Sequence, residues 1–332
     1  MKVVFFHRKK LQGAYSIEAL FENVRKALPS DVTYSVKELS FISQGFFKRL
    51  YILLESALHQ GDINHITGDV HFITLLLRKK RTILTIHDIG FMSHPRAFER
   101  FLLKWFWLIL PVRRSAAVTV VSKATKEALR KYFKGDSRLK IHVIPNPIGD
   151  EFVRMESKFN DKEPVILQIG TKPNKNLSRL IEAISGIKCK LDVVGQLTEE
   201  ILTKLKIYNI DFVISKNLTR EEIVNKYMQA DIVSLVSTYE GFGLPIVEAN
   251  AVGRVVVTSN VSSMPEVAGK AAHLVDPFDI ESIRSGFMKV INDATYREQL
   301  ISNGFENRKR FDNDRIASQY AAVYESIMRN EP

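Results

Sequence analysis

Short apolar runs alternate with longer amphipathic stretches along the whole chain. A run of about four to eight apolar residues is typical of a buried strand, and apolar residues three or four positions apart are typical of a helix. Strands that alternate with helices indicate a parallel sheet with helices on both faces. In the first half the pattern predicts strands at Val3–Phe6, Val32–Val36, Ile63–Thr67, Thr82–Ile86, Ala117–Val121 and Ile141–Ile144, and helices such as Ser16–Leu28, Phe46–Leu58 and Lys123–Phe133.

The same alternation restarts in the second half, where the last segment, Asp279 to Met328, has a helical pattern without a strand. The prolines and the glycine of Pro145–Asp150 cannot continue a regular element, so they mark a break between two series. We therefore predict two doubly wound, Rossmann-like α/β domains, at 1–148 and 149–312. The strands predicted for the second are Val165–Ile169, Leu191–Val194, Phe212–Ile214, Ile232–Val236, Val255–Thr258 and His273–Val275.

The composition fits a cytoplasmic protein with two cores. The chain has 332 residues, of which 45% are hydrophobic, and holds no apolar run long enough to span a membrane. Charged residues at Arg8–Lys10 directly follow the first apolar run, as expected for a core strand and not for a secretory signal. The single cysteine, Cys189, cannot form an internal disulfide, and its place beside a strand-like run predicts a core residue and not a nucleophile.

The positive charge is concentrated in the first half of the chain. Residues 1–150 hold 25 Lys and Arg against 12 Asp and Glu, a net +13, whereas the remainder holds 23 against 25, a net −2. A one-sided basic surface attracts anionic lipid headgroups, phosphorylated acceptors or nucleic acid. Solubility alone would also account for it.

A glycine, or a polar side chain that can bind or react with a ligand, follows each of four predicted strands. In parallel sheets ligands bind beyond the carboxyl ends of the strands, so these positions predict one central cleft between the two domains. They are His87, Thr171, Gly195 and Glu240.

A run with two carboxylates and a glycine turn begins at Glu240 and ends at Glu248. The strand before it and Pro245, which suits a first helical turn, predict a strand, a turn and a helix start. We expect Gly241 and Gly243 to adopt left-handed backbone angles and to approach a ligand closely. The N–H groups of the helix start form an anion site, so the run can bind a molecule with phosphate and hydroxyl groups.

This run resembles the signature of the retaining glycosyltransferases with the two-domain GT-B architecture, the large group 1, or family four, set. The signature is two glutamates with seven residues between them and Gly-Phe-Gly-Leu-Pro inside, and it is intact here. Further segments resemble the family in its order over nearly the whole chain: Ile86–Asp88, Ile144–Pro147, Ile169–Asn176, Val255–Ser259 and Pro265–Val267.

The resemblance implies the GT-B fold, with two Rossmann-like domains that face a central cleft and a final helix, about 314–329, that packs back on the first domain. It implies a metal-independent, retaining transferase that moves a sugar from a nucleotide-diphosphate sugar to a glycan or lipid-linked saccharide acceptor. The process would be surface polysaccharide biosynthesis, in the cytoplasm or at the inner face of the membrane. The nucleotide sugar is then a co-substrate, and no cofactor is expected.

The resemblance also implies roles for single residues. The catalytic set is His87, Glu240 and Lys175, and Glu248 accepts hydrogen bonds from ribose hydroxyls. His65 and Asp88 are weaker candidates on the acceptor side. The positions implied to bind the donor are Gly13, Gly170, Thr171, Lys172, Lys175, Gly195, Asn217, Leu218, Gly241, Phe242, Gly243, Leu244 and Glu248.

The chemistry supports the roles of Thr171, Lys172 and Lys175. The leaving diphosphate gathers negative charge while the sugar becomes oxocarbenium-like, so fixed cations and N–H donors are needed. The spacing between Thr171 and Lys175 is one residue shorter than is usual in the family, and Lys172 could supply the missing positive group. A lysine beside a helix start is otherwise most often solvated.

No metal site is expected. The histidines and Cys189 show no metal-ligand spacing. The acidic triplet Asp312–Asp314 precedes the final helical pattern, where Asp and Asn are common caps.

Two aromatic stretches with adjacent lysine and arginine, Phe41–Leu58 and Phe98–Arg114, fit two interpretations equally. One is a helix in a membrane interface, and the other is a helix packed on its own sheet. The basic first half favours contact with an anionic membrane surface.

Three alternative functions remain. A nucleotide-sugar epimerase of GT-B shape would need further carboxylates in the cleft for proton abstraction, and the sequence shows no such set. A non-catalytic scaffold could bind the nucleotide without turnover. A nucleic-acid-binding protein fits the charge alone and leaves the glutamate pair without a role, so nucleic acid is not an expected partner.

Overall fold

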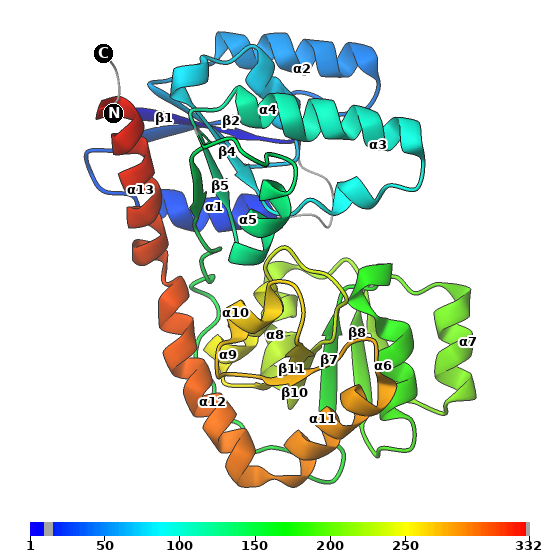
Figure 1. The fold of residues 1–332 in the computed structure, drawn as a ribbon. Helices are drawn as coiled ribbons and strands as arrows, with labels where there is room; N and C mark the ends of the chain where they lie inside the picture. The colour runs from blue at the N-terminus through cyan, green and yellow to red at the C-terminus, as the bar shows by residue number, and fades with distance from the viewer. Residues whose placement is uncertain (10–15, 138, 330–332) are drawn as a thin grey trace. The chain divides into compact units, whose positions relative to one another are not determined.

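The computed structural model describes residues 1–9, 16–137 and 139–329, and the chain divides into two compact units. Unit 1 comprises Met1–Pro147 and the C-terminal segment that begins at Asn313, and unit 2 comprises Ile148–Asp312. Each unit is built on one six-stranded sheet with flanking helices (Figure 1).

The sheet of unit 1 is wholly parallel, in the order β2-β1-β3-β4-β5-β6. Its strands are β1 Lys2–His7, β2 Thr33–Glu38, β3 Ile63–Ile66, β4 Thr82–Ile86, β5 Ala117–Val120 and β6 Ile141–Val143. The helices of this unit are α1 Ser16–Lys26, α2 Phe46–Leu58, α3 Ala97–Leu103, α4 Leu110–Arg113, α5 Lys123–Arg130 and α13 Asn313–Arg329, with a π-helical turn at Lys104–Ile109.

Both faces of this sheet are buried, as its first strand shows. Val3 and Phe5 pack in one apolar cluster with residues of α1 and α13, and Val4 and Phe6 pack in another with residues of α2 and α5. Successive side chains of a strand point to opposite faces, so a strand that is apolar throughout requires a cover on each side.

The sheet of unit 2 is also parallel, in the order β12-β11-β10-β7-β8-β9. Its strands are β7 Val165–Ile169, β8 Lys190–Val194, β9 Asp211–Ser215, β10 Ile232–Leu235, β11 Val255–Ser259 and β12 His273–Val275. The helices of this unit are α6 Leu177–Ile184, α7 Glu199–Ile207, α8 Arg220–Gln229, α9 Leu244–Val252, α10 Met264–Ala268, α11 Ile280–Asn292 and α12 Ala294–Arg308.

The predicted fold class is confirmed, and every predicted strand is present with ends within two residues of the prediction. The helix predicted at Lys123–Phe133 ends earlier, at Arg130, because Tyr132 and Phe133 continue in tight turns. Cys189 is a core residue, and burial raises the pKa of its thiol to about 11.

Helix α13 completes the core of unit 1. Ile316, Tyr320 and Tyr324 lie in the same apolar cluster as Phe5 and Phe21. The helix thus belongs to the first unit, although its sequence follows the whole of the second.

The interpretation of His65 as an acceptor-side residue was wrong. Its ring is fully buried under α13, where Nδ1 lies 2.8 Å from the Tyr324 hydroxyl and Nε2 lies 2.7 Å from the Thr85 hydroxyl. Both ring nitrogens are therefore occupied within the core. Burial, with the nearby charges of His7, His87 and Arg25, holds the pKa of His65 well below its usual value.

This burial predicts acid sensitivity of unit 1. Below about pH 6.5 the unfolded chain takes up a proton that folded His65 cannot, so the free energy of unfolding should fall by about 1.4 kcal/mol per pH unit for this group. Urea unfolding at a series of pH values measures the slope, and His65→Gln should lower it. An equal slope in both proteins between pH 6.5 and 5 would contradict the prediction.

Candidate functional site

The order of the strands creates a crevice in unit 2. The chain winds outward in one direction from β7 and in the other direction from β10, and these two strands are neighbours. Loops that leave the carboxyl ends of two such strands diverge, and ligands of doubly wound sheets bind between them. The loop after β7 contains Gly170–Lys175, and the loop after β10 contains Ser237–Gly243.

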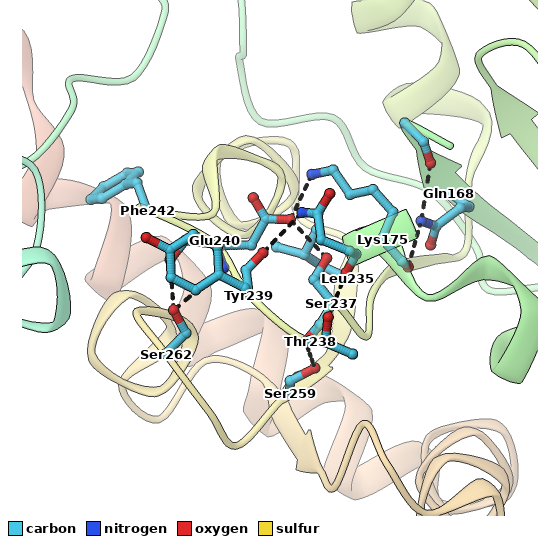
Figure 2. A network of polar contacts seen from close by, with 12 residues as sticks. Gln168, Lys175, Leu235, Ser237, Thr238, Tyr239, Glu240, Phe242, Ser259 and Ser262 are labelled. Carbon is cyan, nitrogen blue, oxygen red and sulfur yellow. Dashed lines mark hydrogen bonds and ion pairs between the residues drawn. The ribbon is translucent and has the colours of Figure 1, made fainter. Parts of the chain in front are cut away.

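An ion pair joins these two loops. The Lys175 ammonium lies 2.7 Å from Oε1 of Glu240, and their side chains are only 16% and 14% exposed. The Ser237 hydroxyl donates to the same carboxylate oxygen at 2.7 Å. Figure 2 shows the two charged side chains pointing toward each other across the two loops. The structure thus gives Lys175 a defined partner, which the sequence did not.

Backbone contacts fix the loops that carry this pair. The Asn174 amide donates to the Tyr239 carbonyl at 2.9 Å, and the Thr238 N–H donates to the Asn174 carbonyl at 2.8 Å. From β7, the buried Gln168 amide reaches the carbonyls of Gly170 and Lys175, both at 3.4 Å (Figure 2). The charged groups are therefore held in place before any ligand arrives, which favours electrostatic catalysis.

Glycine is required at two positions near Thr171: the residue before it in the chain, and the first residue after β8. Gly170 and Gly195 have φ angles of 88° and 146°, in the left-handed region. A Cβ on Gly195 would lie 2.7 Å from Cγ2 of Thr171, and one on Gly170 would lie 3.0 Å from Cε of Lys175. The Thr171 hydroxyl donates to the Gln196 carbonyl at 2.7 Å, while Lys172 is exposed beside it.

The glycine turn behaves differently from the prediction in two respects. Gly243 adopts a φ of 106° and directly precedes α9, but Gly241 does not have a positive φ. The Phe242 side chain is 4% exposed and packs edge-on against Phe311 in the core, so only its backbone can serve a ligand. No described side chain caps α9. The backbone N–H groups of its first turn, around Leu244, can therefore donate hydrogen bonds to an anion.

Glu248 lies one turn inside α9 and is 6% exposed. The Tyr227 hydroxyl donates to Oε2 at 2.5 Å, and a guanidinium nitrogen of Arg220 lies 3.3 Å from Oε1. Burial raises the pKa of Glu248 from its usual value, whereas Arg220 and Tyr227 lower it. The carboxylate is thus an acceptor of hydrogen bonds in a site that offers water little access.

Asn217 and Leu218, two of the positions implied to bind the donor, lie in the turn that precedes α8. Asn217 has a φ of 56°, a conformation that Asn tolerates better than most residues. Leu218 is partly buried, and Thr219 caps the helix in a capping box with Glu222.

In unit 1, His87 follows β4, and its Nε2 lies 2.9 Å from the Thr67 carbonyl. Burial lowers the pKa of this histidine, so it is mainly neutral at pH 7. Asp88, which follows His87, is a weaker candidate on the acceptor side. It is exposed, and its Oδ1 accepts a hydrogen bond from the Gly90 N–H at 2.7 Å. Gly13 lies outside the described residues.

The sequence pattern does not single out the residues that contact the carboxylates of Glu240 and Glu248. Ser237 lies three residues before Glu240, and this spacing could have suggested a contact between them. Arg220 and Tyr227 are seven positions apart and so lie on one face of α8, a spacing typical of a shared neighbour.

In the part of the chain that the structure describes, no three His, Cys, Asp or Glu side chains lie close enough together to hold a metal ion. Asp312 directly precedes α13, and Asp314 lies in its first turn.

Two family models match the chain. "Glycosyl transferases group 1" matches residues 150–307, and "Glycosyltransferase Family 4" matches residues 19–152. The chain belongs to the group 1, or family four, glycosyltransferases. The matches adjoin at the boundary between the two units and together cover most of the protein.

Curated relatives of this glycosyltransferase are similar over part of their length. "MMP alpha-(1->4)-mannosyltransferase" of Mycolicibacterium hassiacum is 27% identical over 246 residues, which are 68% of this chain and 58% of the relative. "O-antigen chain mannosyltransferase B" of Escherichia coli is 27% identical over 278 residues, 75% of this chain and 71% of the relative. The chain thus spans less than two thirds of the first relative.

Solved structures share the fold of this glycosyltransferase. The Anabaena protein HepE, crystallised with UDP and glucose, superimposes with a TM-score of 0.78 over 98% of this chain and 100% of its own, at 17% identity.

The pair of Lys175 and Glu240 predicts coupled stability effects. Lys175→Met should lower the melting temperature of the glycosyltransferase, because it leaves a largely buried carboxylate without a cation. Adding Glu240→Gln should restore part of the loss, with a coupling energy of about 1–3 kcal/mol. The exposed pair of Lys309 and Glu306, at 2.8 Å, is the matched control and should show no measurable coupling. Additive effects at Lys175 and Glu240 would contradict the prediction.

Proposed function

We propose that the protein is a retaining, metal-independent glycosyltransferase that transfers a sugar from a nucleotide-diphosphate sugar to a glycan or lipid-linked saccharide. The observation that carries the proposal is the ion pair of Lys175 and Glu240 at the reversal point of the sheet, beside the uncapped start of α9. It combines a cation, a carboxylate and N–H donors in one crevice, which suits a ligand with both phosphate and hydroxyl groups.

In this proposal the diphosphate lies at the start of α9, near Lys175 and Thr171. The bond between the anomeric carbon and the leaving phosphate oxygen breaks, and negative charge builds on the diphosphate. Lys175 and the helix N–H groups stabilise that charge because they are already oriented. Glu240 holds hydroxyls of the donor sugar, Glu248 holds those of the ribose, and the turn at Asn217 and Leu218 lies near the base.

We propose a front-face displacement for the transfer. The acceptor hydroxyl oxygen forms the new bond on the face from which the diphosphate leaves, so the anomeric configuration is kept. The proton of that hydroxyl passes to an oxygen of the departing phosphate. His87 contributes as a neutral hydrogen-bonding group, in keeping with its lowered pKa.

Surface polysaccharide biosynthesis is the process that we propose. Both curated relatives named above are mannosyltransferases, and one of them acts, by its name, on an O-antigen chain. Mannose is therefore the first sugar to test, with GDP-mannose as its donor.

A panel of UDP-, GDP-, ADP- and dTDP-sugars tests the proposal by thermal shift. One of them should stabilise the protein by roughly 2.7 kcal/mol at a hundredfold excess over its Kd. Glu240→Ala and Lys175→Ala should then reduce turnover at least about a hundredfold, as expected for lost electrostatic stabilisation. Exposed Lys206→Ala in α7 is the control and should keep turnover. Stabilisation by none of the sugars would contradict the proposal, and binding without turnover would favour the scaffold.

We further propose that α2 contacts the inner face of an anionic membrane. No helix in the described part of the chain is long and apolar enough to cross a bilayer. Helix α2 nevertheless exposes apolar side chains four positions apart, Phe46, Leu50, Leu54 and Leu58, which form one stripe along the helix. Phe47 beside them is 82% exposed.

The setting of this stripe suits a lipid interface. Lys48 is exposed beside it. The Arg49 guanidinium lies 4.8 Å from the ring centre of Trp107 and so connects α2 with the helical segment formed by α3 and the π-helical turn after it. That segment exposes Phe98 and Phe101. It also buries Trp107 and Leu108, as expected for a helix packed on its own sheet.

Vesicle flotation tests this contact. The protein should float with phosphatidylglycerol vesicles at low salt and less at high salt, because screening weakens the attraction of Lys48 and its basic neighbours. Phe46→Ser/Phe47→Ser should reduce the floating fraction several-fold. Ile207→Ser, at a 73% exposed apolar position in unit 2, is the control. Failure of the unaltered protein to float would contradict the contact.

A further inference from the structure

Two residues of α8 hold the buried carboxylate of Glu248. Tyr227 is fully buried and donates to Oε2 at 2.5 Å, while Arg220, which begins the helix, approaches Oε1 at 3.3 Å. A carboxylate offers about four lone-pair sites, so both oxygens can still accept further hydrogen bonds. The hydrogen bonds already present fix the plane of the group.

Arg220 is itself fixed from the other side. Its Nε donates to Glu151, and its guanidinium lies 4.6 Å from the ring centre of Phe152. Glu151 and Phe152 belong to the first residues of unit 2, after the boundary at Pro147. The arginine thus connects the start of the unit to the carboxylate on α9, and its orientation does not depend on a ligand.

Tyr227 is fixed through its backbone and its helix. The Arg254 guanidinium donates to the Tyr227 carbonyl at 3.2 Å. On the same helix, Lys226 pairs with Asp192 of β8 at 2.9 Å. The Tyr227 hydroxyl is therefore held in the position from which it donates to Oε2 of Glu248.

We propose that Arg220 and Tyr227 are positioning residues that keep Glu248 ionised and oriented to accept hydrogen bonds from two neighbouring hydroxyls of the nucleotide. The site would then select ribonucleotides over 2′-deoxyribonucleotides, because a deoxyribose leaves one acceptor position of a buried carboxylate unpaired. This inference rests on the proposed function, since it takes Glu248 to be the ribose-binding residue.

The charges around Glu248 set the direction of its pH response. Burial raises the pKa of Glu248, Arg220 and the Tyr227 hydroxyl lower it, and Glu151 raises it. Removing either α8 group therefore raises this pKa further. A protonated carboxyl accepts hydrogen bonds poorly, so nucleotide binding should weaken as pH falls, and it should weaken at a higher pH in the variants.

Calorimetric titration with UDP, GDP and ADP, each beside its 2′-deoxy counterpart, tests the inference between pH 5 and 8. The unaltered protein should prefer the ribonucleotide roughly tenfold or more. Tyr227→Phe and Arg220→Ala should bring this ratio toward one and move the acid loss of binding to higher pH. Arg220→Lys should restore part of both effects, since it keeps the charge.

Tyr208→Phe is the matched control, because Tyr208 is a half-buried tyrosine of α7's end whose hydroxyl has no hydrogen bond among the described residues. It should leave the ratio and the pH dependence unchanged. If a variant lost affinity equally for the ribonucleotide and the deoxyribonucleotide, and the pH dependence of binding did not move, the residue would have only a structural role. That result would overturn the inference. Binding of none of the nucleotides to the unaltered protein would instead count against the proposed function.

Discussion

The reversal of strand order between β7 and β10 is the constraint on which the site depends. Two neighbouring parallel strands deliver their following loops to the same edge of the sheet, yet the helices that continue these loops lie on opposite faces. Neither loop can cover the other completely, and polar side chains collect between them. The ion pair of Lys175 and Glu240 spans this gap. The chemistry is thus located by topology before any single side chain is considered.

Internal contacts satisfy the charged groups of the site. Lys175 has Glu240 and Glu248 has Arg220, and all four side chains are at least partly withdrawn from water. When a ligand binds, these charged groups therefore exchange partners within the protein for partners on the ligand. Such an exchange involves little reorganisation, because the backbone around the groups is fixed by Asn174 and Gln168.

The sequence was sufficient for the sheets and for the loops that carry the candidate residues, because both follow from local patterns. Strand periodicity and the glycine turn placed Glu240 and Thr171 at strand ends. The errors concern the direction of side chains. His65 follows the strand pattern, but its face of the sheet is covered by α13, which comes much later in the chain. Phe242 lies in the motif, but its ring is drawn into the core by Phe311. Only long-range packing decides such directions.

The membership of α13 in unit 1 has a consequence for biosynthesis. Its Ile316, Tyr320 and Tyr324 fill a core whose buried residues outside α13 lie between Val3 and Ile144, before unit 2 in the chain. The sheet of unit 1 therefore keeps one apolar face uncovered until unit 2 has been synthesised, whereas unit 2 has all its strands and helices before α13 is made. Domains generally fold in the order of synthesis. Here the order of completion is inverted, and a nascent chain stalled before α13 would leave this apolar face of the sheet exposed.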